Sequence, residues 1–262
     1  MPMSNRVNHK MNQIFIGLFL LSILNLVFIE AGKCGCQKSK LKRAISLKID
    51  DMLLDHVDLM KIEGFRGYDK NARRWTDNTL KYTFHPQFPA DKKQIVRESM
   101  NELTNDLKGC VKYVESTSGY HIKVQSHQPG CWSFVGMLNK QEGSQELNLE
   151  NPGCLYSKGT IKHEFIHATG FMHTQMRANR DEFVNIFWER IDSDFCHAFV
   201  TCKNCEETVT YKTNSVMHYP SESFPCPGQR ITMVDKQNKE IPYNHGTIEE
   251  DHQMINHLYQ CK

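Results

Sequence analysis

The segment from Lys162 to His173, "KHEFIHATGFMH", combines three histidines and one glutamate at a spacing suited to chemistry on a metal ion. His163 and His167 are four residues apart, so on a helix both imidazoles project from the same face and can reach one ion at about 2.0–2.1 Å. Three imidazoles this close together would otherwise compete for partners and shift each other's protonation. Zinc is the metal that this set favours.

Glu164 comes directly after His163, and this offset turns its carboxylate from direct ligation toward a water on the metal. There it can take the proton as the water attacks a carbonyl carbon. The histidine pair alone has a plain alternative, a surface helix with two solvated histidines. Gly170 and His173 argue against it, because glycine can end the helix in the left-handed conformation and return a third imidazole to the ion. Three protein ligands leave one position open, as in catalytic zinc sites.

The residues before this segment indicate a small sheet and one amphipathic helix. Alternation in "TLKYTF", residues 79–84, is typical of a strand. A helix is predicted from Asp91 to a C-cap at Gly109. Its apolar positions are Val96, Met100, Leu103 and Leu107. Four further short strands are predicted at "CVKYV", "YHIKV", "CWSFVGML" and "QELNL".

The residues after the histidines are predicted to form helices and loops. The stretch "DEFVNIFWERI", residues 181–191, is helical in composition. The end of the chain, "TIEEDHQMINHLY", opens with Thr247 and Glu250 at the spacing of a capping box. Between these two stretches the chain is rich in cysteines and turn residues. The predicted fold class is therefore α+β, with strands early and helices and loops late.

The N-terminus has the layout of a secretory signal. Residues 14–29 form an apolar run between a basic front end and small residues, so we expect a signal peptide at residues 1–32, cleaved near Ala31 to Lys33. An uncleaved signal anchor is the alternative, although the run is short for a full span and two polar residues interrupt it. The prediction is a secreted, extracellular protein.

A propeptide is predicted at residues 33–70 and a catalytic domain at residues 71–262. Residues 33–49 are basic and a group of acids follows, which is typical of a solvated, loosely structured segment; the charged face of a short helix is the alternative. The ten cysteines, an even number, suit an exported chain whose thiols are oxidised to disulfides.

The full pattern HExxHxxGxxH, here "HEFIHATGFMH", is followed by "SVMHY" at Ser215 to Tyr219. Together they resemble the metzincin zinc endopeptidases and specifically the astacins. The resemblance runs from about Trp75 to Cys261 and includes "RWTDNTLKYTF", "GCVKYV", "GCWSFVG" and "RANRDEFVNI". It implies two lobes on either side of a cleft, with a small N-terminal-lobe sheet, an active-site helix and one catalytic Zn²⁺ at the cleft floor.

The same resemblance implies roles for individual residues. The three histidines would bind the zinc, and Glu164 would be the general base. Tyr219 would ligate the resting zinc and swing out to hold the oxyanion. Met217 would lie in the turn beneath the zinc. Without the upstream motif these last two residues would more simply be a half-buried tyrosine and a core methionine.

The cysteines divide into two groups. The resemblance implies disulfides from Cys110 to Cys261 and from Cys131 to Cys154. Four cysteines exceed the family's minimal set and allow three pairings among themselves: Cys196, Cys202, Cys205 and Cys226. Disulfides are favoured over a metal knuckle or redox pair at "CKNC" because the chain is exported. These four bracket Met217, so they are predicted to stiffen loops on one rim of the cleft.

Two positions depart from the astacin pattern. Thr174 follows the third histidine, where most astacins have a glutamate that receives the trimmed N-terminus. The family's prosegment carries F-x-G-D, whose aspartate occupies the zinc before activation, whereas this chain has "FRGYD", with Asp69 one residue late. We therefore predict that no buried N-terminal ion pair forms, and that cleavage near Lys70 or after Arg73-Arg74 need not fall at one fixed bond.

Three residues before the catalytic domain are candidates for closing the zinc site before activation: Asp69, Cys34 and Cys36. The cysteines would act through a thiolate, which zinc binds well. Disulfides at Cys34 and Cys36, to each other or elsewhere, are the alternative.

The sequence thus predicts a secreted zinc-dependent endopeptidase in which a zinc-bound water attacks the peptide bond, with Glu164 as general base. A non-catalytic secreted binding protein or venom component with the same fold is the alternative, but its signature would be loss of Glu164, which is present. The formal charge of +2 favours neither a nucleic acid nor a membrane partner. Proteins or peptides are the expected substrates, and a monomer is expected.

Overall fold

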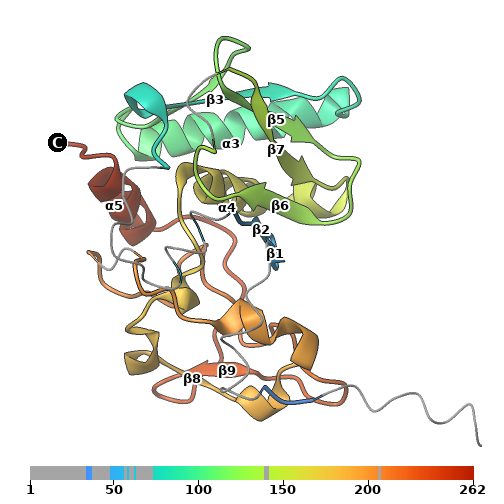
Figure 1. Ribbon diagram of the computed structural model, residues 1–262, viewed down its shortest axis with the longest axis vertical. Coiled ribbons are helices and arrows are strands. Elements are labelled where there is room, and N and C mark those ends of the chain that lie inside the picture. Colours follow the sequence, from blue (N-terminus) through green and yellow to red (C-terminus); the bar gives the residue numbers. More distant parts are fainter. Residues whose placement is uncertain are drawn as a thin grey trace, which may run out of the picture.

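Alternating apolar residues in the first half of the chain form the strands of one mixed sheet (Figure 1). The computed structural model describes residues 34–36, 48–55, 58, 62, 73–138, 142–205 and 208–262. Within them the strands lie in the order β1-β2-β6-β7-β5-β3-β4. Their bounds are β1 Lys48–Ile49, β2 Met52–Leu53, β3 Thr79–Phe84, β4 Lys112–Glu115, β5 His121–Gln125, β6 Cys131–Phe134 and β7 Ser144–Leu149. The strands predicted from the sequence are β3 to β7, with β6 shorter than expected.

Strand β6 lies between β7 and the short β1-β2 hairpin in this sheet. Strand β6 runs antiparallel to β7, whereas the β3-β4, β3-β5 and β5-β7 pairs are parallel. Strands β1 and β2 form a hairpin, and β2 pairs in parallel with β6 so that Met52 lies opposite Ser133. The predicted propeptide therefore covers the edge of β6. The expectation that residues 33–49 are solvated and loosely structured is wrong for the part of them that the structure describes.

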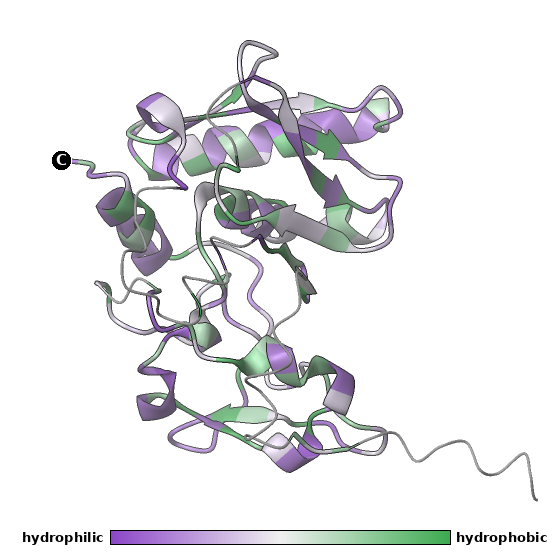
Figure 2. Cartoon of the chain, in the orientation of Figure 1, coloured by the Kyte–Doolittle hydropathy of each residue, from purple (hydrophilic) through white to green (hydrophobic). Residues whose placement is uncertain are grey.

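Two helices pack against the sheet and against each other. Helix α3, Lys93–Asp106, buries Val96, Met100 and Leu103, and the alternation of apolar and polar residues along it is visible in Figure 2. It ends before the predicted C-cap, and Gly109, at φ +72°, instead closes the following turn by donating its N–H to the Thr104 carbonyl oxygen. Helix α4, Lys158–Thr169, carries the first two histidines and the glutamate.

The predicted helix at residues 181–191 is wrong. Val184–Ile186 forms strand β8, which pairs antiparallel with β9, Met233–Asp235. Short 3₁₀ turns flank β8 at Arg180–Glu182 and Trp188–Arg190. Local composition favoured a helix, but backbone bonds to a strand far along the chain decide the conformation.

The C-terminal helix is confirmed, with its cap shifted by one residue. Helix α5 spans Glu249–Leu258, and Ile248 is its N-cap. The Asp251 carboxylate accepts the backbone N–H of Ile248 at 3.0 Å. The predicted capping pair, Thr247 and Glu250, is therefore wrong by one position.

The described residues bury two apolar cores, one in each of two lobes (Figure 1). The sheet lobe comprises the seven-stranded sheet with α3 and α4, and α5 packs into its core through Ile255 and Tyr259. The loop lobe comprises residues 171–205 and 208–246, built from β8, β9, turns and loops. Its core also contains Ile49, Met52 and Leu54 from the β1-β2 hairpin. The α+β class and the two-lobed architecture are confirmed.

Five disulfides join the described segments. Cys110–Cys261 and Cys131–Cys154 form as the resemblance implied. The four additional cysteines do not pair among themselves, apart from Cys202–Cys205. The other two bonds are Cys34–Cys226 and Cys36–Cys196. Spacing could not indicate these pairs, because their partners lie in the predicted propeptide.

No helix within the described part of the chain is long and apolar enough to cross a membrane. The predicted signal peptide, residues 1–32, lies outside the described residues, so both the signal and its signal-anchor alternative stay predictions.

The first turn of α4 packs closely against the loop before α5, which generates a prediction. A Cβ added at Gly159 would overlap the His245 carbonyl oxygen, whereas one added at Gly153 would meet nothing within 4 Å. Alanine is normally the better helix residue, but overpacking costs about 1–3 kcal/mol. We expect Gly159→Ala to lower the Tm by roughly 5 °C, and Gly153→Ala to leave it unchanged or slightly raised. Differential scanning calorimetry of both variants tests this, and equal Tm values would contradict it.

Candidate metal centre

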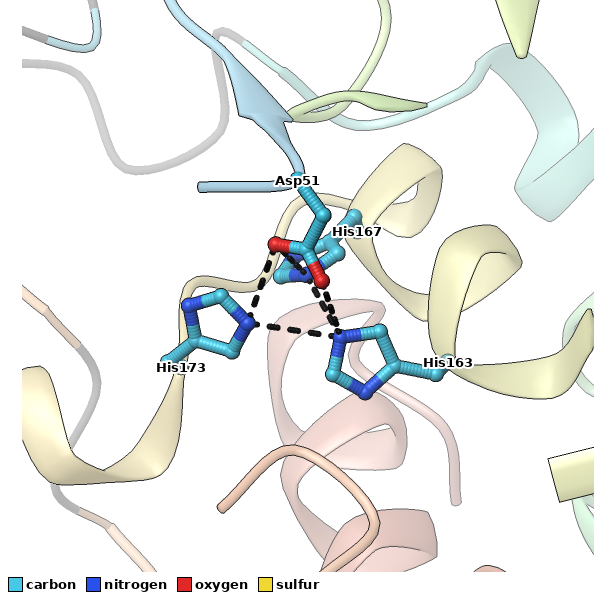
Figure 3. A group of neighbouring side chains, drawn as sticks. All are labelled: Asp51, His163, His167 and His173. Atoms are coloured by element: carbon cyan, nitrogen blue, oxygen red, sulfur yellow. Dashed lines mark hydrogen bonds and ion pairs between the residues drawn. The ribbon is translucent and has the colours of Figure 1, made fainter. Parts of the chain in front are cut away.

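Helix α4 and the turn after it bring the three predicted histidines to one point (Figure 3). His163 and His167 lie on one face of the helix, and their Nε2 atoms are 3.0 Å apart. Gly170 ends the helix in the left-handed conformation at φ 119°, as predicted. The turn returns His173, whose Nε2 lies 3.3 Å from that of His163.

Backbone carbonyl groups fix the orientation of two of these rings. His163 Nδ1 donates to the Val216 carbonyl oxygen at 2.8 Å, and His167 Nδ1 donates to the Phe171 carbonyl oxygen at 2.7 Å. Since a carbonyl oxygen only accepts, the proton of each neutral imidazole is on Nδ1. The Nε2 lone pairs therefore point at the common centre, which is the usual arrangement of metal-binding histidines.

A residue that the sequence analysis did not select, Asp51, completes the group. Its Oδ2 lies 3.0 Å from His163 Nε2, and its Oδ1 lies 3.1 Å from His173 Nε2 and 3.4 Å from His167 Nε2. Burial alone would raise the pKa of Asp51, but its interaction with the surrounding imidazoles of His173, His167 and His163 holds it well below its usual range. The carboxylate is therefore ionised and only accepts.

The donor set fits zinc. Two donors that are each 2.0–2.1 Å from one tetrahedral ion are about 3.3–3.4 Å apart, close to the separations of 3.0–3.4 Å found here. Nitrogen lone pairs and an anionic oxygen directed at one point repel each other unless a cation lies between them. Three imidazoles and one carboxylate are ligands that zinc takes.

Glu164 lies beside this centre but is not one of its donors. It is almost completely buried, at 1% exposure, and its Oε2 has no hydrogen-bond partner among the described residues. Burial, and then the negative charges of Asp51 and Asp50, raise the pKa of Glu164 well above its usual range. A buried carboxylate with a free oxygen and a raised pKa is suited to accept a proton.

Tyr219 and Met217 come from the segment that passes beneath the centre. Met217 is fully buried, and its carbonyl oxygen accepts the Thr174 N–H at 2.8 Å, which ties this turn to the residue after His173. The Tyr219 ring lies 4.4 Å from that of His173, centroid to centroid. The Tyr219 hydroxyl donates to Asp50 Oδ2 at 2.8 Å. In this state Asp51, and not Tyr219, is the fourth member of the group.

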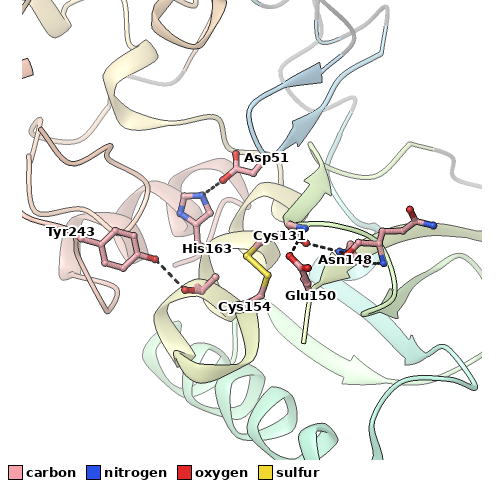
Figure 4. Close-up of a disulfide and its surroundings, with 10 residues drawn as sticks. Asp51, Cys131, Asn148, Glu150, Cys154, His163 and Tyr243 are labelled. Carbon is pink, nitrogen blue, oxygen red and sulfur yellow. Dashed lines mark hydrogen bonds and ion pairs between the residues drawn. A yellow bond between two sulfur atoms is a disulfide. The ribbon is translucent and has the colours of Figure 1, made fainter. Parts of the chain in front are cut away.

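These side chains line a cleft of about 420 Å³. His163, Glu164 and Tyr219 lie on its walls, and the aromatic rings of Trp132 and Phe224 line it as well. The Cys131–Cys154 disulfide lies next to this site, and the Tyr243 hydroxyl meets Thr160 of α4 at 3.1 Å (Figure 4). A concave site of this size beside the metal centre is suited to bind a segment of a substrate.

The candidates for closing the site need correction. Cys34 and Cys36 are both in disulfides, so neither offers a thiolate to the metal. Asp69 lies outside the described residues. Asp51 occupies the position that these candidates were expected to take. A signal for it does exist in "KIDD", residues 48–51, which matches F-x-G-D only at its last position.

Two residues before Asp51 depart from that motif: Lys48 stands in place of phenylalanine, and Asp50 in place of glycine. The φ of Asp50 is +55°. This left-handed conformation favours glycine but is also open to aspartate and asparagine at moderate cost. The hairpin turn is therefore kept with a residue type that differs from the family's glycine.

The second departure, Thr174, lies beside a buried carboxylate. Its Oγ1 donates to Ser215 Oγ at 3.2 Å, and Ser215 Oγ in turn donates to Asp251 Oδ1 at 2.5 Å. The neutral Thr174 side chain is thus held within a hydrogen-bonded row. The absence of an N-terminal ion pair stays a prediction.

Comparison with known proteins agrees with this site. The family model for astacin, a family of peptidases, matches residues 67–260. High choriolytic enzyme 1 of Oryzias latipes is 34% identical over 59% of this chain and 57% of its own length. Zinc metalloproteinase nas-4 of Caenorhabditis elegans is 32% identical over 72% of this chain and 60% of its own length. The chain thus spans less than two thirds of either curated relative.

A solved structure gives the same result for the fold. The hatching-enzyme zinc protease from Oryzias latipes superposes with a TM-score of 0.64 at 28% identity, covering 72% of this chain and 94% of that chain. The chain therefore belongs to the astacin family of metallopeptidases. The family's cofactor is one catalytic zinc, and the three histidines with Asp51 form the group that can hold it.

The convergence of the donors predicts the metal content. We expect the full chain to retain one zinc ion, and His167→Ala to weaken zinc affinity by at least about a hundredfold, since removing even a ligand's partner costs 10–100-fold. Glu164→Gln and His121→Ala should keep the ion, because neither removes a donor. Metal analysis after dialysis against a competing chelator tests this. Full retention by His167→Ala would show that the metal binds elsewhere.

Proposed function

We propose that this chain is the precursor of a secreted zinc endopeptidase that hydrolyses peptide bonds in proteins. The observation that carries the proposal is the buried Glu164, whose unpaired oxygen lies in the cleft beside three histidine Nε2 atoms that converge on one point. A bound zinc would supply a Lewis acid that polarises the peptide carbonyl and makes water a better nucleophile.

The chain's own residues supply the proton transfers and orientation. His163, His167 and His173 would hold the ion through Nε2, and backbone carbonyl oxygens fix the rings of His163 and His167. Glu164 accepts the proton of the attacking water and can return it to the leaving amine, since burial raises its pKa and its Oε2 has no other hydrogen-bond partner among the described residues. Tyr219 is placed to donate its hydroxyl to the oxyanion of the tetrahedral intermediate once Asp50 releases it.

The substrate is proposed to bind along β6. In the structure the edge of this strand pairs with β2, which shows that it accepts an added strand. Extended peptides commonly bind by adding a strand to such an edge, with main-chain hydrogen bonds giving affinity. Removal of the β1-β2 hairpin would therefore open both the metal centre and the strand edge in one step.

Asp51 is proposed to keep the precursor latent. Its carboxylate lies at the position that water and substrate must reach, and its hairpin lies on the substrate edge. Arg73 is buried, ion-paired with Asp55 and Asp58, and its carbonyl oxygen accepts the Met137 N–H. A cut at Arg73 therefore requires this contact to open first, whereas Lys70 lies outside the described residues.

Secretion is supported by the predicted signal at residues 1–32 and by the pairing of all ten cysteines in five disulfides. Disulfides of this density are typical of oxidising, extracellular surroundings. We propose a monomer that acts on protein substrates, with the propeptide at residues 33–70 and the catalytic domain at residues 71–262.

The general-base role of Glu164 predicts a separation of binding from catalysis. In the processed enzyme, Glu164→Gln should lower kcat on casein or gelatin by about 10²–10⁴ while zinc content stays at one per chain. Glu182→Gln, an exposed glutamate in the loop lobe, is the matched control and should keep full activity. If wild type holds zinc, is fully processed and still cuts nothing, the chain is a binding protein that retains the fold.

The position of Asp51 predicts that the uncut precursor can be activated by one substitution. A contact made by a charged group is worth about 1.5–3 kcal/mol, so Asp51→Ala should raise peptidase activity of the uncut chain roughly ten- to a hundredfold. Asp55→Ala, which loosens the same segment at Arg73 without touching the histidines, should leave the precursor latent. Cleavage of a short fluorogenic peptide measures this, and equal activity of the two variants would remove Asp51 from the latency mechanism.

A further inference from the structure

The predicted propeptide begins with three residues that behave as part of the loop lobe. We call Cys34, Gly35 and Cys36 the anchor segment. Its backbone lies alongside residues 188–192: the Gly35 N–H donates to the Ile191 carbonyl oxygen at 3.0 Å, and the Cys36 N–H donates to the Trp188 carbonyl oxygen at 2.9 Å. Cys34 also pairs with Asp192 in an antiparallel bridge.

Residues 188–192 pair on their other side with the loop that carries Phe224. The Asp192 N–H donates to the Phe224 carbonyl oxygen at 3.0 Å, and the Cys226 N–H donates to the Arg190 carbonyl oxygen at 2.8 Å. The anchor segment is therefore the outer member of a three-stranded backbone arrangement. Since Phe224 lines the cleft, this arrangement supports one wall of the catalytic site.

Two disulfides fasten the anchor segment to both neighbouring loops. Cys34 is bonded to Cys226, and Cys36 is bonded to Cys196. Cys36 also packs against the apolar core of the loop lobe. Gly35 has φ +90°, and a Cβ there would lie 3.6 Å from the Glu189 Cα, so the segment follows the neighbouring backbone closely.

The order of the chain gives these bonds a consequence for activation. Asp51 follows Cys36 by fifteen residues, and the proposed activating cut, near Lys70 or after Arg73-Arg74, falls after the β1-β2 hairpin. Such a cut is C-terminal to both cysteines and to Asp51. Hydrolysis of one peptide bond consumes one water and creates one new carboxylate and one new amine, while both disulfides stay intact.

We infer that the N-terminal fragment remains covalently attached after activation, so that the working enzyme has two disulfide-linked chains and keeps Asp51 as a tethered competitor for its own metal centre. Fifteen residues span up to about 50 Å when extended, which lets the hairpin leave the cleft without breaking a disulfide. A tethered ligand whose link can span the distance to its site has an effective concentration of up to about millimolar, so the hairpin competes with substrate after the cut.

Retention of the N-terminal fragment does not depend on catalysis. The proposed competition between Asp51 and substrate does rest on the proposed peptidase function. The test uses the full oxidised chain with residues 66–72 replaced by the recognition sequence of a site-specific protease. After digestion that a reduced sample shows to be complete, intact mass is measured without and with reductant. We expect one species without reductant, equal to the chain plus one water, and two fragments with it. Two fragments without reductant would overturn the inference.

Cysteine variants identify the bonds responsible. The pair Cys34→Ser/Cys226→Ser and the pair Cys36→Ser/Cys196→Ser should each still retain the fragment through the other disulfide. The four substitutions together should release it. Cys202→Ser/Cys205→Ser removes a disulfide of the same lobe that does not touch the anchor segment, and should retain it fully. Retention by the fourfold variant would assign the attachment to non-covalent contacts and overturn the disulfide link.

Activity on a fluorogenic peptide tests whether Asp51 on the tethered hairpin competes with substrate. After the cut, Asp51→Ala with both disulfides intact should be about tenfold more active than the wild-type sequence, given a millimolar effective concentration. Equal activities would show that the tethered hairpin does not compete and would overturn this part. If neither protein cuts any substrate, the proposed function fails, and the competitive role of Asp51 fails with it. The intact-mass measurement still shows whether the N-terminal fragment is retained.

Discussion

The structure is organised around the mutual repulsion of its own metal donors. Three imidazole lone pairs and one carboxylate point at a single position, an arrangement that is stable only around a cation. Each neighbouring element contributes a constraint to it. Helix α4 sets the spacing of His163 and His167, Gly170 turns the chain back, and the turn containing Met217 supplies a carbonyl oxygen to orient His163.

What the sequence predicted well is local. The histidines, Glu164 and Gly170 lie within a few residues of one another, so helical geometry alone places them, and the structure agrees. The strands β3 to β7 were also predicted, because the alternation of apolar and polar residues along a strand follows which side chains are buried. The helix expected at residues 181–191 failed for the opposite reason. Val184 and Ile186 pair with β9 from a distant part of the chain, and no local pattern reports that pairing.

The residues that the sequence did not reveal are those whose partners are remote. Asp51 is far along the chain from His163, and only the β1-β2 hairpin on β6 brings them together. The segment before it differs from the family's motif at both Lys48 and Asp50; aspartate in the left-handed conformation at position 50 preserves the turn without the motif's glycine. The disulfide partners of Cys34 and Cys36 could not be predicted for a similar reason. An even count of cysteines predicts bonds but not partners, and here the partners lie on the other side of the presumed boundary.

The boundary between the predicted propeptide and the predicted catalytic domain does not separate two independently packed parts of the folded chain. Ile49, Met52 and Leu54 belong to the predicted propeptide, yet they are almost completely buried in the loop lobe's core. Burying each apolar side chain is worth about 1.5–3 kcal/mol, so the hairpin is held by packing as well as by Asp51. Met172 and Tyr219 belong to the same core, and Tyr219 also lines the cleft. A substrate bound along β6, as proposed, would take the place of β2, so side chains that hold the hairpin would be available to the substrate.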